Sequence, residues 1–454
     1  MGLKVIILAA GKGTRMRSSL PKVLQPLAGQ PLLQHLVARA KQLGAQKILT
    51  VVGHESHLVE AVMADQGVHF VLQSEQLGTG HAVQQALPEI ADEDSVLVLY
   101  GDVPLTADST LKDLLGLLSP QQPLALLTID LVNPSGYGRV VRNAHHEVCA
   151  IVEQKDARPE QLQIREVNTG ILAVQGRFLK QWLGQLQSNN AQGEFYLTDI
   201  IAMCVADGYS VHTTQPATEM EVLGVNDKAQ LQALERLYQQ QQAAELMRQG
   251  VTLLDASRLD VRGAVTVGQD VQIDVNVILE GSVTLGNNVK IGAHCVLKNV
   301  RIGDGCEVQP FSHLEDCVLA QNVSVGPFAR LRPGTELADN VRIGNFVETK
   351  QAKIGSGSKV NHLSYIGDTQ MGAQCNIGAG TITCNYDGVN KHQTVIGDGV
   401  FVGSDTQLIA PVHLGDGATI GAGSTITKDV PAHELTLSRA KQLTLKGWQK
   451  PQKR

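Results

Sequence analysis

The 454-residue chain has no marked excess of either charge, since 38 basic and 44 acidic side chains give a formal net charge of -6. This balance excludes a broad basic surface for nucleic acid or anionic membranes, so any anionic substrate must be held locally. No apolar run approaches a membrane span, and the start, MGLKVIILAAGKG, lacks the features of a secretory signal. The seven cysteines are scattered and form no Cys-x-x-Cys pair. We therefore expect reduced thiols in a cytoplasmic protein, with neither nucleic acid nor a membrane as partner.

The length of the chain favours two or more domains. Three apolar runs in the first half are typical of short buried strands: residues 4–8, 47–52 and 96–100. Two stretches between them have helical spacing: residues 34–43 and 58–63. This alternation predicts a Rossmann-like α/β domain with a mostly parallel sheet.

A single helix is predicted between the two halves. Leucines recur three residues apart after Asp227, a candidate N-cap, and Gly250 is a candidate stop. The expected organisation is a domain, a helical linker and a second domain, over residues 1–226, 227–250 and 251–454.

The second half has a period of six. One ladder of aliphatic residues spaced six apart is Val267, Ile273, Leu279, Leu285, Ile291 and Leu297. A second ladder is Ile396, Val402, Leu408, Leu414, Ile420 and Ile426. Such hexapeptide repeats predict a parallel β-helix, in which each turn buries its aliphatic residue against the turns above and below. The aromatic content of 4% fits its narrow interior.

The repeat is interrupted in a few places. Steps of five residues occur at three points: Leu297 to Ile302, Leu314 to Leu319, and Ile366 to Met371. The largest interruption is TCNYDGVNKHQTV, residues 383–395. Because repeat proteins place insertions as loops on one face, often the binding face, this segment is a candidate site.

A glycine-containing turn, LAAGKGTRM at residues 8–16, directly follows the first buried strand. Its backbone N–H groups can bind phosphate oxygens, while Lys12, Arg15 and Lys22 supply positive charge. The turn lacks the third glycine of the dinucleotide fingerprint and does not match a P-loop. We interpret it as a site for nucleotide transfer, although two glycines in a turn can also be purely structural.

Asp102 ends the strand-like segment VLVLYGD, which places its carboxylate at the carboxyl edge of the expected sheet, where such sheets bind ligands. One carboxylate can suffice for Mg²⁺ beside a triphosphate, because waters and phosphate oxygens complete the octahedron. The alternative is a turn-forming aspartate. For Asn226 taken alone, the alternative of a helix-start residue is the stronger one.

Seven segments of the first half resemble, in order, those of the sugar-nucleotide pyrophosphorylases: LAAGKGTRM with LPK, QLGTGHA, YGDVPL, GYGR, IVEQKDA, EVNTG and GVN. The resemblance implies UMP transfer from UTP to N-acetylglucosamine-1-phosphate, with Mg²⁺ held by Asp102 and Asn226 and with Arg15 and Lys22 as catalytic cations. It also implies nucleotide or sugar contacts at Leu8, Ala9, Ala10, Gly11, Lys22, Gln73, Gly78, Thr79, Tyr100, Gly101, Asp102, Gly138, Glu153, Asn168 and Asn226.

His362 should point outward from the β-helix, because the repeat register makes Ile354, Val360 and Ile366 the buried residues. An imidazole titrates near ~6.5, so it can act as a general base at neutral pH. Cations and amides in neighbouring repeats suit a phosphorylated amino sugar. The alternative is an ordinary solvated histidine.

Five segments of the second half resemble the acetyltransferase half of a bacterial bifunctional family, the N-acetylglucosamine-1-phosphate uridylyltransferases/glucosamine-1-phosphate N-acetyltransferases: RLRPGTEL, GNFVETK, KVNHLSYIGD, NIGAGTITCNYDG and FVGSDTQLIAPV. The resemblance implies a left-handed β-helix, His362 as general base and a homotrimer with acetyl-transfer sites between chains. It implies sugar-phosphate contacts at Arg332, Lys350, Tyr365 and Asn376. It implies acetyl-CoA contacts at Ala379, Asn385, Tyr386, Ser404, Ala422 and Arg439.

Two other functions compete with a bifunctional enzyme. The β-helix could be a structural stalk on a pyrophosphorylase, or the whole chain could be a non-catalytic scaffold that binds sugar nucleotides. The His362 and NYDG segments argue against the first, and both Asp102 and His362 would have to be incidental for the second.

Overall fold

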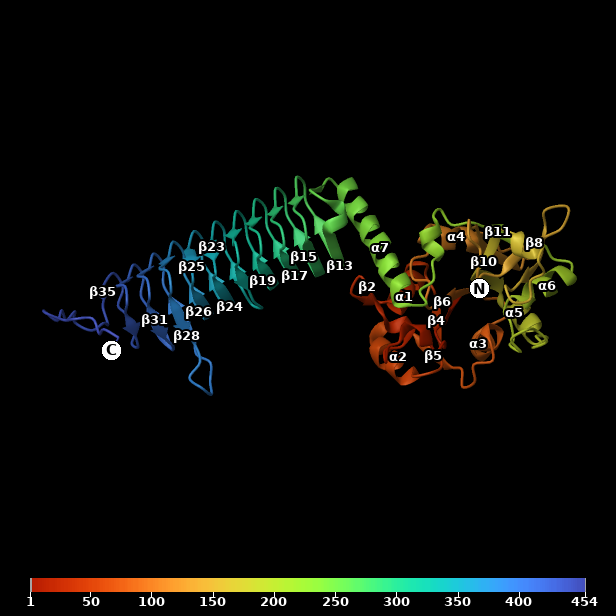
Figure 1. Ribbon diagram of the computed structural model, residues 1–454, viewed down its shortest axis with the longest axis horizontal. Coiled ribbons are helices and arrows are strands. Elements are labelled where there is room, and N and C mark those ends of the chain that lie inside the picture. Colours follow the sequence, from red (N-terminus) through yellow and green to blue (C-terminus); the bar gives the residue numbers. More distant parts are fainter. Residues whose placement is uncertain (1, 454) are drawn as a thin grey trace. The chain divides into compact units, whose positions relative to one another are not determined.

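The computed structural model describes residues 2–453, which form two compact units that divide between Leu237 and Tyr238 (Figure 1). Each unit is described separately below.

The first unit is built on a twisted sheet. Its main path runs β11 (His212–Thr214), β7 (Leu124–Asp130), β10 (Glu166–Gln175), β6 (Ser95–Tyr100), β1 (Leu3–Leu8), β4 (Lys47–Val52) and β5 (His69–Leu72). All neighbours on this path pair in parallel except at β10, which runs antiparallel to both β6 and β7. The hairpin β8 (Arg139–Arg142) and β9 (Val148–Val152) pairs with β10. The predicted mostly parallel sheet is therefore confirmed.

Helices cover both faces of this sheet. One core contains residues of α1 (Leu32–Gln42), α2 (Ser56–Met63) and α4 (Asp108–Gly116). The other contains residues of α3 (Thr79–Ala86), α5 (Gly176–Leu183) and α6 (Asp199–Ala206). On β1, Val5 and Ile7 belong to the first core and Ile6 to the second. Burial on both faces explains why the strands are continuous apolar runs.

Helix α7 (Lys228–Arg248) lies where the sequence predicts a single helix. The Asp227 carboxylate accepts a hydrogen bond from the Gln230 backbone N–H at 2.8 Å, as an N-cap does. Gly250, just past the helix end, has a φ of 96°, a backbone conformation that favours glycine. The division between the compact units lies within this helix.

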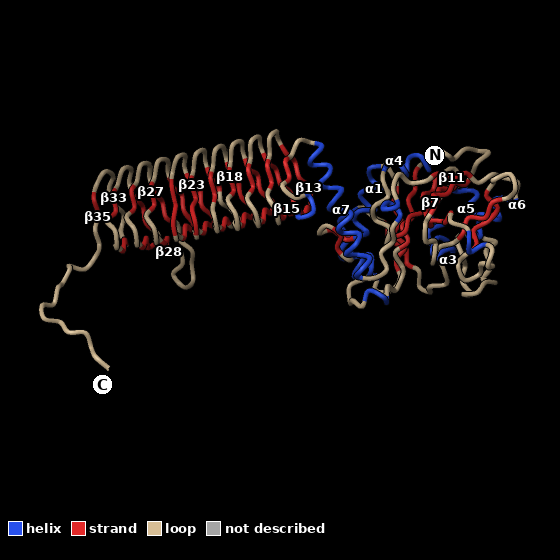
Figure 2. The backbone as a smooth tube through the Cα atoms, turned by 45° about the horizontal axis from the view of Figure 1, so that its top comes forward, coloured by secondary structure: helices blue, strands red, loops and turns tan. Residues whose placement is uncertain are grey.

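The second unit is a parallel β-helix (Figure 2). One sheet stacks β12 (Thr252–Leu253), β14 (Gln272–Ile273), β16 (Lys290–Ile291), β18 (Glu307–Val308), β20 (Ser324–Val325), β23 (Arg342–Asn345), β25 (Lys359–His362), β27 (Asn376–Ile377), β30 (Phe401–Val402), β33 (Thr419–Ile420) and β35 (Leu435–Thr436). The other stacks β13 (Leu259–Val267), β15 (Val277–Leu285), β17 (Val296–Ile302), β19 (His313–Leu319), β21 (Arg330–Leu331), β24 (Glu348–Ile354), β26 (Tyr365–Met371), β28 (Ile382–Cys384), β31 (Gln407–Ile409) and β34 (Thr425–Ile426). Three further strands join that sheet: β22 (Glu336–Leu337), β29 (Thr394–Ile396) and β32 (Val412–Leu414).

The strand register confirms the hexapeptide repeat. Leu279 pairs with Leu297, three repeats later, and both are fully buried. The predicted five-residue step appears where Leu285 pairs with Ile302, only 17 residues later. Apart from the partly buried Val267, the aliphatic residues of both ladders are buried in one continuous core.

The predicted insertion is a loop between β28 and β29, visible below β28 in Figure 1. Met371 pairs with Ile396, 25 residues later, so the additional residues leave the coil. The Asp387 carboxylate accepts hydrogen bonds from the N–H groups of Val389 and Asn390, and His392 lies 2.7 Å from it. These contacts hold the Asp387 pKa well below its usual range and give the loop a fixed turn.

Candidate active sites

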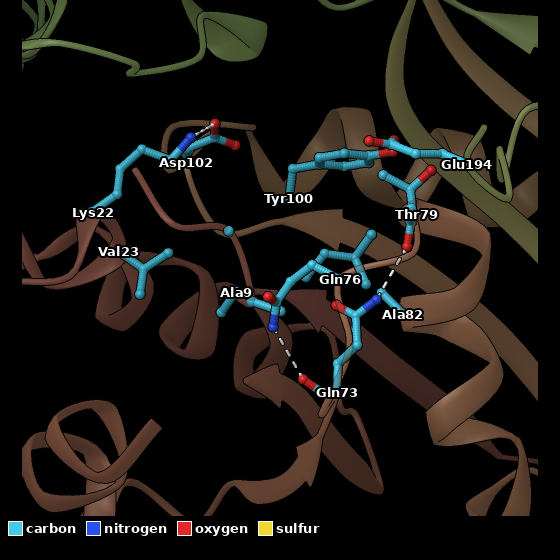
Figure 3. Close-up of a pocket in the computed structure, with 14 residues that line it drawn as sticks. Ala9, Lys22, Val23, Gln73, Gln76, Thr79, Ala82, Tyr100, Asp102 and Glu194 are labelled. Atoms are coloured by element: carbon cyan, nitrogen blue, oxygen red, sulfur yellow. Dashed lines mark hydrogen bonds and ion pairs between the residues drawn. The ribbon is translucent and has the colours of Figure 1, made fainter. Parts of the chain in front are cut away.

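The first candidate site is a cavity of about 250 Å³ at the carboxyl edge of the α/β sheet (Figure 3). Ten of the residues proposed to bind nucleotide or sugar line it: Leu8, Ala9, Ala10, Gly11, Lys22, Gln73, Gly78, Thr79, Tyr100 and Asp102. They come from five separate segments of the sequence. The sheet brings them together, because the carboxyl ends of β1, β5 and β6 lie along the same edge.

Glycine is required at the base of this cavity. β1 and β6 are neighbours with Leu8 paired to Tyr100, and the Gly101 N–H donates to the Leu8 carbonyl at 2.9 Å. A Cβ added to Gly101 would lie 2.9 Å from that carbonyl oxygen and 2.8 Å from Val23. Gly101 therefore permits the close packing of β1, β6 and Val23 beneath the cavity, although it does not itself line the cavity.

Two oxygen donors converge beside the cavity. The Lys22 ammonium forms a short ion pair with the Asp102 carboxylate and lies 3.4 Å from the Asn226 side-chain oxygen. Arg15 donates to the same Asn226 oxygen at 2.9 Å. The Lys22 ammonium thus contacts the side-chain oxygens of both Asp102 and Asn226. A carboxylate oxygen and an amide oxygen are ligands that Mg²⁺ accepts alongside substrate phosphates. Within residues 2–453, no group of three or more His, Cys, Asp or Glu side chains forms an all-protein metal site.

Buried contacts fix the relative position of Asp102 and Asn226. The Val225 N–H donates to the Asp102 carbonyl at 2.9 Å. The nearby Glu221 carboxylate, only 5% exposed, accepts hydrogen bonds from the Ala107 N–H and from the Thr110 hydroxyl at 2.6 Å. The segment after Asp102 is therefore tied to the segment before Asn226 although the two residues are far apart in sequence.

Three further predicted residues gather next to Tyr100 without lining the main cavity. Glu153 lines a neighbouring cavity of about 170 Å³, and a Cβ added at Gly138 would meet its carboxylate at 3.3 Å. The Asn168 N–H donates to the Gly138 carbonyl at 2.9 Å. Burial raises the pKa of the Glu153 carboxyl, and burial together with Glu153 raises the pKa of the Tyr100 hydroxyl. Perturbed groups of this kind are typical of ligand sites.

Sequence reasoning missed part of this first site. Val23, Gln76, Ala82 and Glu194 also line the cavity. Gln76 lies inside the QLGTGHA segment and could have been included. Glu194 could not, because its place depends on the Phe195 carbonyl, which accepts a hydrogen bond from the Gly80 N–H at 2.8 Å.

The second candidate site is a column of residues along one corner of the β-helix. Strand pairing aligns Asn345 with His362. The registers of β25 with β27, β27 with β30 and β30 with β33 carry the same column on to Ala379, Ser404 and Ala422. Arg439 continues it, donating to the Ala422 carbonyl at 2.9 Å. With neighbouring strands about 4.8 Å apart, the column from His362 to Ala422 spans roughly 15 Å.

His362 ends strand β25 and its side chain is exposed, so its predicted outward direction is confirmed. Its Nδ1 lies 3.0 Å from the side-chain oxygen of Asn345, one coil earlier. Because an amide oxygen only accepts, this contact favours the neutral tautomer with the proton on Nδ1 and the lone pair on Nε2. This is the tautomer that a general base requires.

Around the same corner, Lys350 and Tyr365, two of the residues proposed to bind the sugar phosphate, belong to a polar network. Lys350 lies 3.8 Å from Asp368, and the Asn385 amide donates to both Asp368 and, at 3.4 Å, the Tyr365 hydroxyl. Arg332, one coil below Lys350, forms a 2.8 Å ion pair with Glu348. Lys350 and Arg332 are therefore cations that could bind phosphate oxygens in place of their present carboxylate partners.

Two of the proposed residues stand apart from that network. Asn376 starts β27 and is paired between Lys359 and Phe401. Tyr386 lies in the insertion loop with 61% of its surface exposed, and its hydroxyl donates to the Gly388 carbonyl at 2.6 Å.

One hollow in this unit, of about 250 Å³, has Asp368, Lys391 and His392 among its lining residues, and none of the residues proposed from the sequence lines it. Asn345, Glu348 and Asp368 were missed from the sequence although each contacts a proposed residue. Counting 17 residues back from His362 would have found Asn345, because that is the local coil length.

Different family models match the first and second halves of the chain. Residues 5–253 match the model of the MobA-like NTP transferase domain. Residues 261–344 match the GMPPB C-terminal domain, and residues 393–428 match bacterial transferase hexapeptide repeats. Fold and sites together define a nucleotidyltransferase joined to a hexapeptide-repeat transferase.

Curated relatives narrow this class to one family. The chain is 67% identical to the bifunctional protein GlmU of Hydrogenovibrio crunogenus, covering 100% of both chains. It is 60% identical to that of Marinobacter nauticus, covering 99% of both chains. The chain belongs to the bifunctional GlmU family, and it is accordingly a two-reaction enzyme, nucleotidyltransferase and acetyltransferase, of UDP-N-acetylglucosamine synthesis.

Solved structures of other proteins are similar to part of the chain. A UDP-glucose pyrophosphorylase complexed with UDP-glucose covers 52% of this chain and 98% of its own, at 19% identity and a TM-score of 0.44. No helix within residues 2–453 has the length and apolar character needed to cross a membrane.

Proposed function

We propose that the α/β cavity transfers UMP from UTP to N-acetylglucosamine-1-phosphate. The sugar-phosphate oxygen attacks the α-phosphorus in line and pyrophosphate leaves, so no covalent protein intermediate forms. Lys22 and Arg15 neutralise the charge that develops on the phosphates. Supporting this assignment, both cations lie within hydrogen-bonding distance of Asn226, at the edge of the cavity.

Asp102 and Asn226 would hold Mg²⁺ in this site. The bound ion supplies charge neutralisation on the phosphates. Lys22, which pairs with Asp102 in the structure, would contact the substrate phosphates. Glu153, Asn168 and Gly138 would contact the sugar side of the substrate, next to Tyr100.

The corner column of the β-helix acetylates glucosamine-1-phosphate in this proposal. His362 Nε2 accepts a proton from the substrate amine as its nitrogen attacks the thioester carbonyl of acetyl-CoA, and the CoA thiolate leaves. Arg332, Lys350, Tyr365 and Asn376 would hold the sugar phosphate. Ala379, Asn385, Tyr386, Ser404, Ala422 and Arg439 would contact acetyl-CoA, whose elongated shape suits a column spanning several coils.

We propose a homotrimer, because the outward-facing column needs a neighbouring chain as its second wall. An exposed ladder of apolar side chains supports packing against another copy: Phe311, Phe328, Phe346 and Leu363. The three phenylalanine rings stack at 5.0 and 5.3 Å, and all four residues have positive φ, which is strained for bulky side chains. The ladder ends beside His362.

The single observation that carries the proposal is the convergence of Asp102, Asn226 and Lys22 beside the cavity, in a chain that also displays the His362 column. One assay tests it. The protein is mixed with glucosamine-1-phosphate, acetyl-CoA, UTP and Mg²⁺, and free thiol and pyrophosphate are followed separately. Both products should appear. If only pyrophosphate appears, with N-acetylglucosamine-1-phosphate supplied, the β-helix is a structural stalk. If neither product appears, the chain is a non-catalytic binding scaffold.

A further inference from the structure

Gln73 presents a hydrogen-bond acceptor to the nucleotide cavity. It follows β5, lines the cavity and is only 3% exposed. Its amide nitrogen donates to the Gly78 carbonyl oxygen at 3.2 Å and lies 3.1 Å from Nδ1 of His81 on α3 (Figure 3). Both N–H groups are thereby used, and the amide oxygen has no protein partner among the described residues. The oxygen is therefore the end of the amide that a ligand meets.

The orientation of this amide is fixed by its two neighbours. A carbonyl oxygen such as that of Gly78 can only accept, so it selects the nitrogen end of Gln73. His81 Nδ1 accepts the second N–H when its proton is on Nε2. Reversing the amide would place its oxygen against the Gly78 carbonyl and leave buried groups unpaired, which is unfavourable.

His81 acts on the cavity only through Gln73. It does not itself line the cavity. Its ring packs near Phe195, with centroids 6.4 Å apart, and Phe195 is held by a hydrogen bond from its N–H to the Leu77 carbonyl at 2.8 Å. Phe195 therefore holds the His81 imidazole in place next to the Gln73 amide.

From this geometry we infer that His81 is a positioning residue for base selection: by locking Gln73 with its oxygen toward the cavity, it makes the site select uracil over cytosine. This inference deepens the proposed function and rests on it. The ring N3 of uracil carries a proton and donates to an acceptor, whereas N3 of cytosine is itself an acceptor and would face the Gln73 oxygen unpaired. Sites that use a buried hydrogen bond in this way reject ligands that lack the matching group.

The test measures uridylyl transfer with UTP, CTP and 3-deaza-UTP, in which N3–H is replaced by C–H. Wild-type protein should prefer UTP to both alternatives in kcat/KM by at least about tenfold, the value of one hydrogen bond to a buried group. His81→Phe keeps a ring beside Phe195 but removes the acceptor. It should reduce the preference for UTP over each analogue by about tenfold. His81→Asn, whose side-chain oxygen can accept at the place of Nδ1, should restore the preference.

Residual uridylyl transfer with UTP by the same variants reports that the α/β unit, which carries His81, is folded. Equal losses with all three nucleotides in His81→Phe would show a merely structural histidine and overturn the inference, as would unchanged selectivity or a wild-type enzyme that accepts 3-deaza-UTP as well as UTP. A wild-type protein that releases no pyrophosphate from UTP would instead overturn the proposed function. The two failures are thus distinguishable.

Discussion

The two units place reactive side chains in opposite ways. In the α/β unit, loops at one sheet edge enclose a cavity, and Gln73, which lines it, is only 3% exposed. In the β-helix unit, each coil contributes one or two exposed residues to a corner, and His362 faces open solvent. A layered α/β fold forms a concave site within one chain, whereas a stack of coils offers a convex one. We therefore propose that the second site gains its walls from loops and from a neighbouring copy.

The sharpest test of this contrast removes the carboxylate at the sheet edge. In our proposal the Asp102 carboxylate holds Mg²⁺, so Asp102→Ala should lower uridylyl transfer by roughly a thousandfold or more, because several kcal/mol of charge stabilisation would be lost. Acetyl transfer should stay close to wild type. Separate assays for pyrophosphate and free thiol measure both, and loss of the two activities together in a folded variant would contradict independent sites.

The matching change in the β-helix is His362→Ala. Loss of a general base should lower the rate of acetyl transfer by about 10²–10⁴. Uridylyl transfer supplied with N-acetylglucosamine-1-phosphate should persist, which serves as the internal control. An unchanged acetyl-transfer rate would remove His362 from the mechanism.

Introducing a charge into the phenylalanine ladder tests whether a second copy completes the convex site. Phe328→Asp should weaken association by about 2 kcal/mol or more per interface, the usual value for a central aromatic side chain. Sedimentation should show smaller species, and acetyl transfer should fall with them at low protein concentration while uridylyl transfer remains.

Val318→Asp provides the matched control, since Val318 is also an exposed apolar residue of the β-helix but lies outside the ladder. A Phe328→Asp protein that sediments and acetylates like wild type would refute the ladder as the interface.

The smallest expected effect concerns the orientation of His362. Asn345→Ala removes the acceptor that holds the proton on Nδ1, so acetyl transfer should fall by roughly 10–100-fold, as for other supporting hydrogen bonds to functional histidines. Lys359→Ala, an exposed change on the same strand as His362, is the control and should have little effect. Equal rates for Asn345→Ala and wild type would show that the ring needs no such support.

Much of the fold could be predicted because it depends on periodicity. The six-residue ladder, the five-residue steps and the insertion loop all follow from counting, and so does the outward direction of His362. Asp102 could be predicted because a buried strand ends just before it. Asn345, Glu348 and Asp368 were not predicted as site residues, because each becomes part of the site through a contact with a proposed residue in a neighbouring coil. Glu194 and the orientation of Gln73 depend on loop contacts that no local pattern encodes.

The insertion loop between β28 and β29 has one more consequence. It adds residues where a coil turns, yet the strands on either side resume the same register, and the His362, Ala379 and Ser404 column continues past it. The length of the insertion loop therefore does not affect the alignment of the His362, Ala379 and Ser404 column. An engineer could lengthen, shorten or exchange this loop to admit a bulkier acyl donor or a different amine, while the base and the backbone behind it keep their spacing.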